Sequence, residues 1–282
     1  LGRSVRTGSS LAFGLPVPRS PFSRVQLSYG LEGIKFGTTG LFGQTDDIYG
    51  KGNVRSTLGL NFTRDTRIDL PFATAGGMET FSAQFSGGPL GGSADFQRYT
   101  GEVRAYAPLG QAGGSKPGSQ PVKFVLGLTA RTGAVFGDPG AFFGFQQFAL
   151  GGVQFGEQLR GYPEFSISPS GYRLNTGLDR AARESFGNAF FSSTVEVGMR
   201  VNQMFYGNLF YDAGNIWNNP RQIFPARLFR GAGFGVSVLT PVVGMLGIDL
   251  GYGFDRQSVN VITGQVRPDP SWQIHFRLGQ MF

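Results

Sequence analysis

The sequence predicts an all-β protein, an antiparallel up-and-down transmembrane β-barrel of about eleven strands. Alternation of apolar and polar residues with period two is the dominant pattern in the 282 residues, and no helical periodicity of comparable strength is present. Connections between the expected strands also alternate between long and short. An up-and-down sheet places these two sets at opposite ends, and long loops at one end with short turns at the other are typical of outer-membrane barrels.

The end of the chain shows the alternation most clearly. Trp272, Ile274 and Phe276 share one parity, whereas His275 and Arg277 share the other, so the two sets face opposite sides of a strand. On this basis we expect strands at 7–17, 24–37, 54–64, 78–86, 95–107, 121–133, 188–201, 205–217, 230–240, 245–256 and 271–282.

The two faces of these strands predict two environments. The polar face carries Gly, Ser, Thr and charged residues, as a wet interior would, and the apolar face is rich in aromatic residues, as a lipid-facing band would be. We expect Phe124, Leu126, Leu128, Ile248, Leu250, Ile274 and Phe276 to point to lipid, and Lys123, Arg131, Glu196, Asp212, Asp249 and Arg277 to point inward. The further polar-face charges Arg98, Glu102 and Arg104, with Lys123 and Arg131, are interpreted as solvating this interior.

Composition excludes several other classes of protein. Glycine contributes 46 residues without a three-residue period, which excludes collagen, and 14% aromatic residues argue against disorder. The absence of cysteine removes disulfides and Cys-ligated metal sites. The net charge is +7 without a basic cluster interleaved with aromatics, so we expect no nucleic-acid partner, whereas anionic lipid is plausible. The alternatives are a soluble lipocalin-like barrel, which has eight strands, and a β-sandwich.

Connection lengths and the strand count also carry information. The long set is 38–53, 87–94, 134–187, 218–229 and 257–270, and the short set is 18–23, 65–77, 108–120, 202–204 and 241–244. Eleven antiparallel strands would leave the first and last strands running in the same direction, so closure would need a parallel seam. Bacterial single-chain barrels have even strand numbers. Either the count of eleven is wrong or further strands precede residue 1, and we expect the second.

The connection 134–187 is by far the longest, and loops of this length are usually functional or disordered. It contains Leu159-Arg160-Gly161-Tyr162. Glu196 and Asp212 lie on the polar parity of two neighbouring strands, so both carboxylates should point inward. A guanidinium fork suits carboxylates, and Arg160 could bridge both, with Gly161 allowing close backbone approach and Tyr162 packing on the wall. The alternative is an Arg160 that is solvated in the loop.

Several motifs follow one another in an order found in a known family. Gly151-Gly152 followed by Leu159-Arg160-Gly161-Tyr162 resembles the Val-Arg-Gly-Phe/Tyr loop of BamA-type outer-membrane assembly proteins, the bacterial surface antigen barrel family. Residues 63–67, 210–217, 233–235 with 239–241, 251–256 and 278–282 match further segments of that family in the same order. The resemblance covers essentially the whole chain.

The resemblance implies a sixteen-stranded barrel that follows periplasmic POTRA domains. Residues 1–282 would then be the C-terminal part of the outer-membrane barrel domain, with five strands and the POTRA domains preceding them. The loop 134–187 would be the family's sixth extracellular loop, folded back into the interior and anchored through Arg160, Gly161, Tyr162, Glu196 and Asp212. The last strand would form one side of a seam between the first and last strands.

The resemblance also implies a function. The family inserts β-barrel proteins into the outer membrane, which implies unfolded outer-membrane β-barrel clients, outer-membrane lipid, and periplasmic chaperones and accessory lipoproteins as partners. Gly279 and Phe282 would belong to a terminal sorting signal, although a lipid-facing aromatic is an equally good interpretation of Phe282. The alternatives are a polypeptide-secretion pore of the two-partner or TamA-like type, and a passive porin.

An enzyme is not expected. His275 is the single histidine, it has no motif around it, and it is interpreted as lining the interior. The sequence contains no G-x-S-x-G motif, no P-loop and no His/Cys metal set. We therefore expect no cofactor, no bound metal and no catalytic residue.

Overall fold

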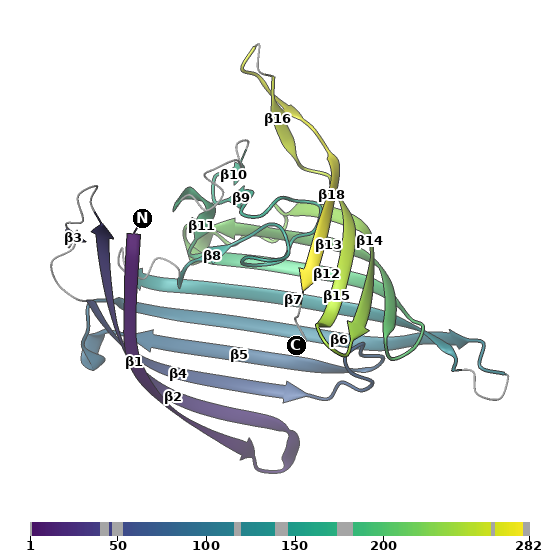
Figure 1. Ribbon diagram of the computed structural model, residues 1–282, viewed down its shortest axis with the longest axis horizontal. Coiled ribbons are helices and arrows are strands. Elements are labelled where there is room, and N and C mark those ends of the chain that lie inside the picture. The colour runs from purple at the N-terminus through teal and green to yellow at the C-terminus, as the bar shows by residue number, and fades with distance from the viewer. Residues whose placement is uncertain are drawn as a thin grey trace. The chain divides into compact units, whose positions relative to one another are not determined.

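The computed structural model describes residues 2–39, 45–46, 53–115, 120–138, 146–173, 183–260 and 263–278. Eleven long strands within these residues pair in chain order, as Figure 1 shows. They are β1 (Gly2–Val17), β2 (Ser20–Thr39), β4 (Asn53–Asp65), β5 (Gly76–Ser86), β6 (Asp95–Ala112), β7 (Val122–Asp138), β12 (Ala189–Arg200), β13 (Phe205–Trp217), β14 (Phe229–Thr240), β15 (Gly244–Gly253) and β18 (Ser271–Leu278). The predicted all-β fold and its strand order are confirmed.

Short elements lie inside the predicted connections. They are β3 (Thr45–Asp46), η1 (Gly88–Leu90), β8 (Phe148–Ala149), β9 (Ile167–Ser168), β10 (Gly171–Tyr172), η3 (Arg183–Ser185), β11 (Phe186–Gly187), η4 (Pro220–Gln222), β16 (Gln257–Val259) and β17 (Val266–Pro268). The described residues contain no helix long and apolar enough to cross a membrane. Strands of two or three residues are too short for their periodicity to be visible, which is why the sequence did not predict them.

Several predicted boundaries are wrong by a few residues. The connection predicted at 18–23 is a tighter turn, because Val17 already pairs with Ser20. β6 and β7 extend beyond their predicted ends to Ala112 and Asp138, whereas β15 ends at Gly253 instead of residue 256. The side-chain alternation and the backbone ladder do not end at the same residue, so pattern alone locates strand ends poorly.

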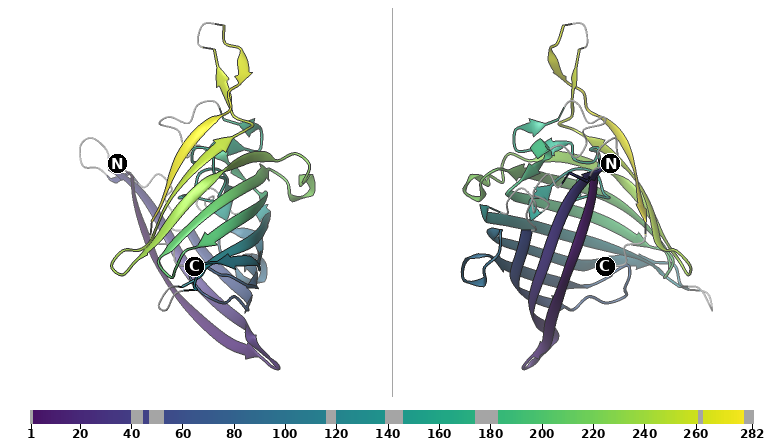
Figure 2. Two further views of the ribbon diagram at one scale, coloured as in Figure 1. Left: turned by 90° about the vertical axis from the view of Figure 1, so that its right-hand side faces the viewer. Right: turned by 60° about the vertical axis from the view of Figure 1, so that its left-hand side comes forward.

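The chain divides into two compact units. One comprises Leu1–Arg64, Thr80–Thr100 and Val135–Gln146 and contains the antiparallel neighbours β1, β2 and β4. The other comprises Asp65–Glu79, Gly101–Ala134 and Gln147–Phe282, and in it β7, β12, β13, β14, β15 and β18 pair one after another. The candidate site lies wholly in this second unit, which Figure 2 shows from two further sides.

The predicted facing of the second unit's strands is confirmed. Leu128, Ile248, Ile274 and Phe276 are among its exposed large apolar side chains, whereas Asp249 is fully buried. Lys123, Arg131, Glu196, Asp212, Asp249 and Arg277 all make ion pairs on the opposite face, which we call the inner face. This separation keeps charge out of lipid, where each charge costs roughly 2–4 kcal/mol at mid-bilayer.

The predicted distribution of connections is also confirmed in this unit. Ala189 pairs with both Ala134 and Trp217, so the connections that follow β7 and β13 leave from the same end of the strands. Gly253 pairs with Ser271, which places the β16–β17 hairpin at that end as well. The short turns 201–204 and 241–243 join strands at the other end.

Candidate functional site

Within the long connection, the described residues 146–173 form a small core of their own. Leu150, Leu159 and Ile167 are fully buried, and Leu150 bridges to both Glu157 and Ile167. The Glu164 carboxylate accepts hydrogen bonds from the backbone N–H groups of Val153, Gln154 and Phe155. The segment that carries Arg160 is therefore held by an ordered loop with its own small core.

Arg160 meets Asp212 of β13 through three hydrogen bonds. Its Nε and Nη2 atoms donate to the two carboxylate oxygens at 2.7 and 2.8 Å, and its backbone N–H donates at 3.1 Å. The Thr194 hydroxyl of β12 donates to the same carboxylate at 2.8 Å. This is the bidentate geometry in which an Arg–carboxylate pair is strongest.

Three further groups of the inner face surround the guanidinium. The carboxylates of Glu196 and Asp249 lie 3.6 and 3.7 Å from Nη1. The Phe210 ring centroid lies 3.4 Å from Cζ, a close cation–π contact. Burial by itself lowers the pKa of Arg160, but the charge and hydrogen bonds of Asp212, with the two other carboxylates, outweigh it and raise that pKa. Arg160 is thus a permanently charged group enclosed by its partners.

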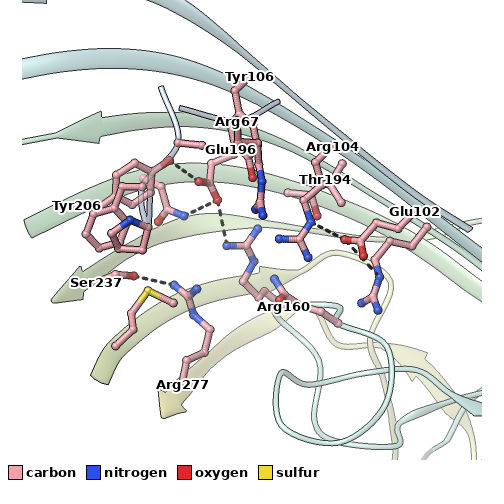
Figure 3. Close-up of a pocket in the computed structure, with 18 of the residues that line it drawn as sticks. Arg67, Glu102, Arg104, Tyr106, Arg160, Thr194, Glu196, Tyr206, Ser237 and Arg277 are labelled. Atoms are coloured by element: carbon pink, nitrogen blue, oxygen red, sulfur yellow. Dashed lines mark hydrogen bonds and ion pairs between the residues drawn. The ribbon is translucent and has the colours of Figure 1, made fainter. Parts of the chain in front are cut away.

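Glu196 has a fixed position of its own (Figure 3). The Tyr206 hydroxyl donates to Glu196 Oε1 at 2.6 Å, and the Asn208 amide donates to Oε2 at 2.5 Å. Arg160 then approaches Oε2 as an ion-pair partner rather than as a hydrogen-bond donor. The predicted bridge is therefore unequal, because Asp212 holds Arg160 directly and Glu196 contributes charge from the side.

Asp249 and Arg277 extend the network toward β18. Arg277 Nε lies 2.6 Å from Asp249 Oδ2, and Nη2 donates to Asp249 Oδ1 at 3.0 Å and to Ser237 at 3.1 Å. Sequence reasoning placed both residues on the inner face without linking them to Arg160. Their parity could have been read further, since it puts a third carboxylate two strands from Asp212.

Gly161 brings the loop backbone against two strands. It adopts φ +90°, and a Cβ there would lie 2.8 Å from the backbone nitrogen of Gly253. Gly231 and Gly251 form the same contact from the strand side, with a Cβ on either falling within 2.5 Å of the backbone of Arg160 or Gly161. The polar-face glycines of β14 and β15 thus form a surface on which the loop backbone lies, and we call them the glycine bed. Their interpretation as residues that line a wet interior did not predict this contact.

His275 lies on the inner face, as predicted, and it also takes part in this contact, which the sequence did not predict. Its Nε2 atom accepts a hydrogen bond from the Gly161 N–H at 3.0 Å. Tyr162 is fully buried and donates its hydroxyl proton to the Arg230 carbonyl at 2.8 Å, while its ring meets Phe229 edge-on. The Arg160-Gly161-Tyr162 segment therefore hydrogen-bonds to three strands, β13, β18 and β14, one through each of its residues in turn.

Most of the other inner-face charges pair with protein groups, which corrects their interpretation as solvating groups. Arg131 binds Glu157 of the loop at 2.9 Å, and Lys123 binds Asp69 of the turn 66–75 at 2.6 Å. Glu102 pairs with Arg104 at 2.5 Å. In the other unit, Arg98 donates to the Gln146 carbonyl at 3.0 Å. Parity revealed where these charges face but not which groups they meet.

The contacts described above attach the loop to the strands. A polar cavity of about 160 Å³ adjoins the network and is lined by side chains that include Arg67, Arg104, Arg160, Glu196 and Arg277. In the described part of the chain, no group of three or more His, Cys, Asp or Glu residues is arranged to hold a metal ion. Gly279 and Phe282, the expected terminal signal, lie outside the described residues.

Comparisons with known proteins found a matching family model and a curated relative. A family model described as the Omp85 superfamily domain matches residues 3–282. The outer membrane protein assembly factor BamA of Nitratidesulfovibrio vulgaris is 31% identical over 187 residues, covering 62% of this chain and 21% of that protein.

Two solved structures share the fold. The crystal structure of BamA from Haemophilus ducreyi lacking POTRA domains 1–3 superposes with a TM-score of 0.67 at 15% identity, covering 97% of this chain and 55% of that one. CdiB from Acinetobacter baumannii superposes with a TM-score of 0.51 at 14% identity, covering 98% of this chain and 42% of that one. The chain spans about a fifth of the curated relative's length and about half of each structure.

Proposed function

The chain belongs to the Omp85 superfamily, and from that premise we propose that it acts in the assembly and insertion of β-barrel proteins into the outer membrane. It is an outer-membrane β-barrel protein, as its family, relatives and fold indicate. We propose that it works without catalysis, with an anchored interior loop and an edge strand as its working parts. Its clients would be unfolded outer-membrane β-barrel proteins, with outer-membrane lipid, periplasmic chaperones and accessory lipoproteins as further partners.

The Arg160–Asp212 contact is the observation that carries this proposal. Arg160, Gly161, Tyr162, Glu196 and Asp212 would fix the loop on the inner face, so that the strands beneath it keep one arrangement while a client is handled. A loop of this length that was only solvated would need none of these contacts. A passive porin would be expected to lack the Arg160 loop motif and to show steady ion conductance.

β18 supplies the second supporting observation. It stands at one end of the strand order, where the family resemblance places the seam with the first strand. Exposed strand edges pair readily with other chains, and peptide recognition by strand addition uses this property. We propose that this edge receives incoming client strands at the seam.

A polypeptide-secretion pore is the second candidate, because the fold is shared with CdiB as well. The two functions differ in where the client ends, since an assembled barrel remains in the membrane and a secreted chain crosses it. Reconstituting the full-length protein in lipid vesicles separates them. We expect a denatured β-barrel client added outside to become heat-modifiable in the membrane, whereas protease-protected client inside the vesicles would support secretion.

Arg160→Ala tests the anchor itself. We expect the strands to remain folded, with heat-modifiable gel mobility retained, while protease cleavage within residues 134–187 becomes faster and client assembly falls. Arg160→Lys should rescue only in part, because an ammonium lacks the planar fork that Asp212 accepts. Unchanged cleavage and full assembly in Arg160→Ala would remove the anchor from the proposal.

A further inference from the structure

The turn that joins β4 to β5 belongs to the second unit. It lies at the end of the strands opposite to the one from which the long loop leaves. Its residues Phe72, Ala73 and Thr74 are buried, although short turns of a membrane barrel normally lie in water. Thr74 donates to the Ile68 carbonyl and to the Asp69 carboxylate, so the turn has an internal structure. We call residues 66–75 the inner turn.

Asp69 fixes the inner turn to two neighbouring strands. Lys123 at the start of β7 lies 2.6 Å from its Oδ2 atom, and Arg200 at the end of β12 lies 3.0 Å from the same atom. Lys123 and Arg200 are register partners across these strands. The Asp69 carboxylate therefore holds the inner turn over one end of β7 and β12, the end at which the short turns lie. Glu196 lies further along β12.

Phe72 then meets Tyr206 at the beginning of β13. The two rings are stacked with centroids 4.9 Å apart and an interplanar angle of 4°. Gly198 of β12 leaves room for the Tyr206 hydroxyl, since a Cβ there would clash with that oxygen. Tyr206 is thus confined by Phe72 and by the backbone of the adjacent strand.

The confined hydroxyl is the one that holds Glu196. It donates to Glu196 Oε1 at 2.6 Å, and Glu196 Oε2 faces Arg160 Nη1 at 3.6 Å. Phe72, Tyr206, Glu196 and Arg160 therefore form one continuous chain of contacts between the inner turn and the loop. A tyrosine ring held on a flat aromatic partner has fewer orientations, so its hydroxyl stays on the carboxylate.

We propose that the inner turn is a positioning element for the loop anchor and that Phe72 acts through the Tyr206 hydroxyl on Glu196. A movement of the turn at one end of the strands is then transmitted to Arg160 near their middle, where it binds Asp212. The inference rests on the proposed role of Arg160 in holding the loop. It adds two positioning residues and a direction of coupling to that role.

The test measures how often the loop opens. Ser166 is fully buried in the loop and its hydroxyl makes no hydrogen bond within the described residues, so Ser166→Cys places a thiol there with little change. Maleimide labelling of the full-length protein in lipid, measured by mass spectrometry of the peptide containing position 166, reports opening. Phe85→Ala, which removes an outward-facing ring, is the matched control and should leave the rate unchanged.

We expect Phe72→Ala and Tyr206→Phe each to raise the labelling rate by about tenfold, the effect of losing one hydrogen bond to a charged group. The double variant should be no faster than either single variant, because both act through the same hydroxyl. Phe72→Tyr, which keeps a flat ring, should restore the slow rate. If Phe72→Ala prevents folding, the same comparison of single and double variants is made with Phe72→Leu. Leucine keeps the apolar volume but cannot stack on Tyr206.

Two results would overturn the inference. Effects of Phe72→Ala and Tyr206→Phe that multiply in the double variant would mean that Phe72 contributes packing alone. A labelling rate that Phe72→Ala or Phe72→Leu leaves unchanged would mean that the turn and the loop are independent. Arg160→Ala measured in parallel separates this failure from failure of the anchor, because the anchor predicts faster labelling in Arg160→Ala whatever Phe72 does.

Discussion

Two arginine–aspartate pairs in the second unit have the same bonding pattern in opposite surroundings. Arg160 donates to Asp212 from Nε, Nη2 and its backbone N–H at 2.7, 2.8 and 3.1 Å. Arg230 donates to Asp255 from the same three groups at 3.2, 2.8 and 2.8 Å. The side chains of the first pair are 2% and 1% exposed, and those of the second are 53% and 28% exposed.

From this difference we expect the surroundings, rather than the bonding geometry, to decide what such a pair contributes to the free energy of unfolding. Water competes for the Arg230 guanidinium and screens its charge, so that pair is worth about 0–1 kcal/mol. Water does not reach the Arg160 guanidinium, which lies against Phe210 and two further carboxylates. Removing one partner of a buried pair leaves the other charge buried without compensation, and this causes most of the loss in stability.

Asp212→Ala should have the largest effect of the changes considered. It removes the acceptor of three Arg160 hydrogen bonds and leaves the guanidinium buried with only Glu196 and Asp249 nearby. We expect the free energy of unfolding to fall by about 3 kcal/mol. Urea titration in lipid vesicles, followed by fluorescence of Trp217 and Trp272, measures it. Asp255→Ala is the matched control, and equal losses in the two variants would break the comparison.

Gly161→Ala should have the next largest effect. Positive φ costs an L-residue roughly 1–2 kcal/mol, and here the new methyl would also strike the backbone of β15. Gly171→Ala is the matched control, because Gly171 has φ +121° with open space around its Cβ position. We expect faster protease cleavage of the loop in Gly161→Ala than in Gly171→Ala. Equal rates would mean that the glycine bed does not constrain the loop.

The strands could be predicted from sequence, and the reason is physical. Lipid on one side and polar groups on the other impose a period of two on every strand, so Ile274 and Arg277 reveal their faces without any knowledge of neighbours. Asp212 and Glu196 could be placed by the same parity. Arg160 needed the motif as well, because a loop has no periodicity that says which way a side chain points.

The remaining contacts could not be predicted, because they join segments that are far apart in the sequence. His275 accepts from Gly161 across 114 positions, and nothing near His275 in the chain marks this contact. Phe72 lies in a segment that reads as an ordinary connection, yet it is buried against Tyr206. Such contacts depend on how deeply each connection enters the interior, which local patterns do not encode.

A pH titration sharpens the comparison with a pair of intermediate exposure. Hydrogen bonds from Lys123 and Thr74, with the charge of Arg200, lower the pKa of Asp69 from 3.8 to about 2. The folded-state pKa lies below the unfolded one, so ionised Asp69 stabilises the fold above pH 3.8, and this stabilisation is lost as the pH falls toward 2.

Asp69 is 31% exposed, so solvent screening keeps the expected contribution below about 1 kcal/mol. The measurement is the urea midpoint of the unmodified protein and of Asp69→Asn between pH 5 and pH 2. The gap between the two midpoints should close as the pH falls. A gap that stays constant over this range would show that the Asp69 charge does not stabilise the turn.

Arg230→Ala should have the smallest effect. The bonds that Tyr162 and Asp255 make to the Arg230 backbone survive the substitution, since they use its carbonyl and its N–H. Only the exposed side-chain pair is lost, which is worth about 0.5 kcal/mol and less in high salt. We expect the urea midpoint, loop cleavage and client assembly to stay close to those of the unmodified protein. A loss approaching that of Asp212→Ala would mean that the bonding pattern itself, and not burial, sets the strength of both pairs.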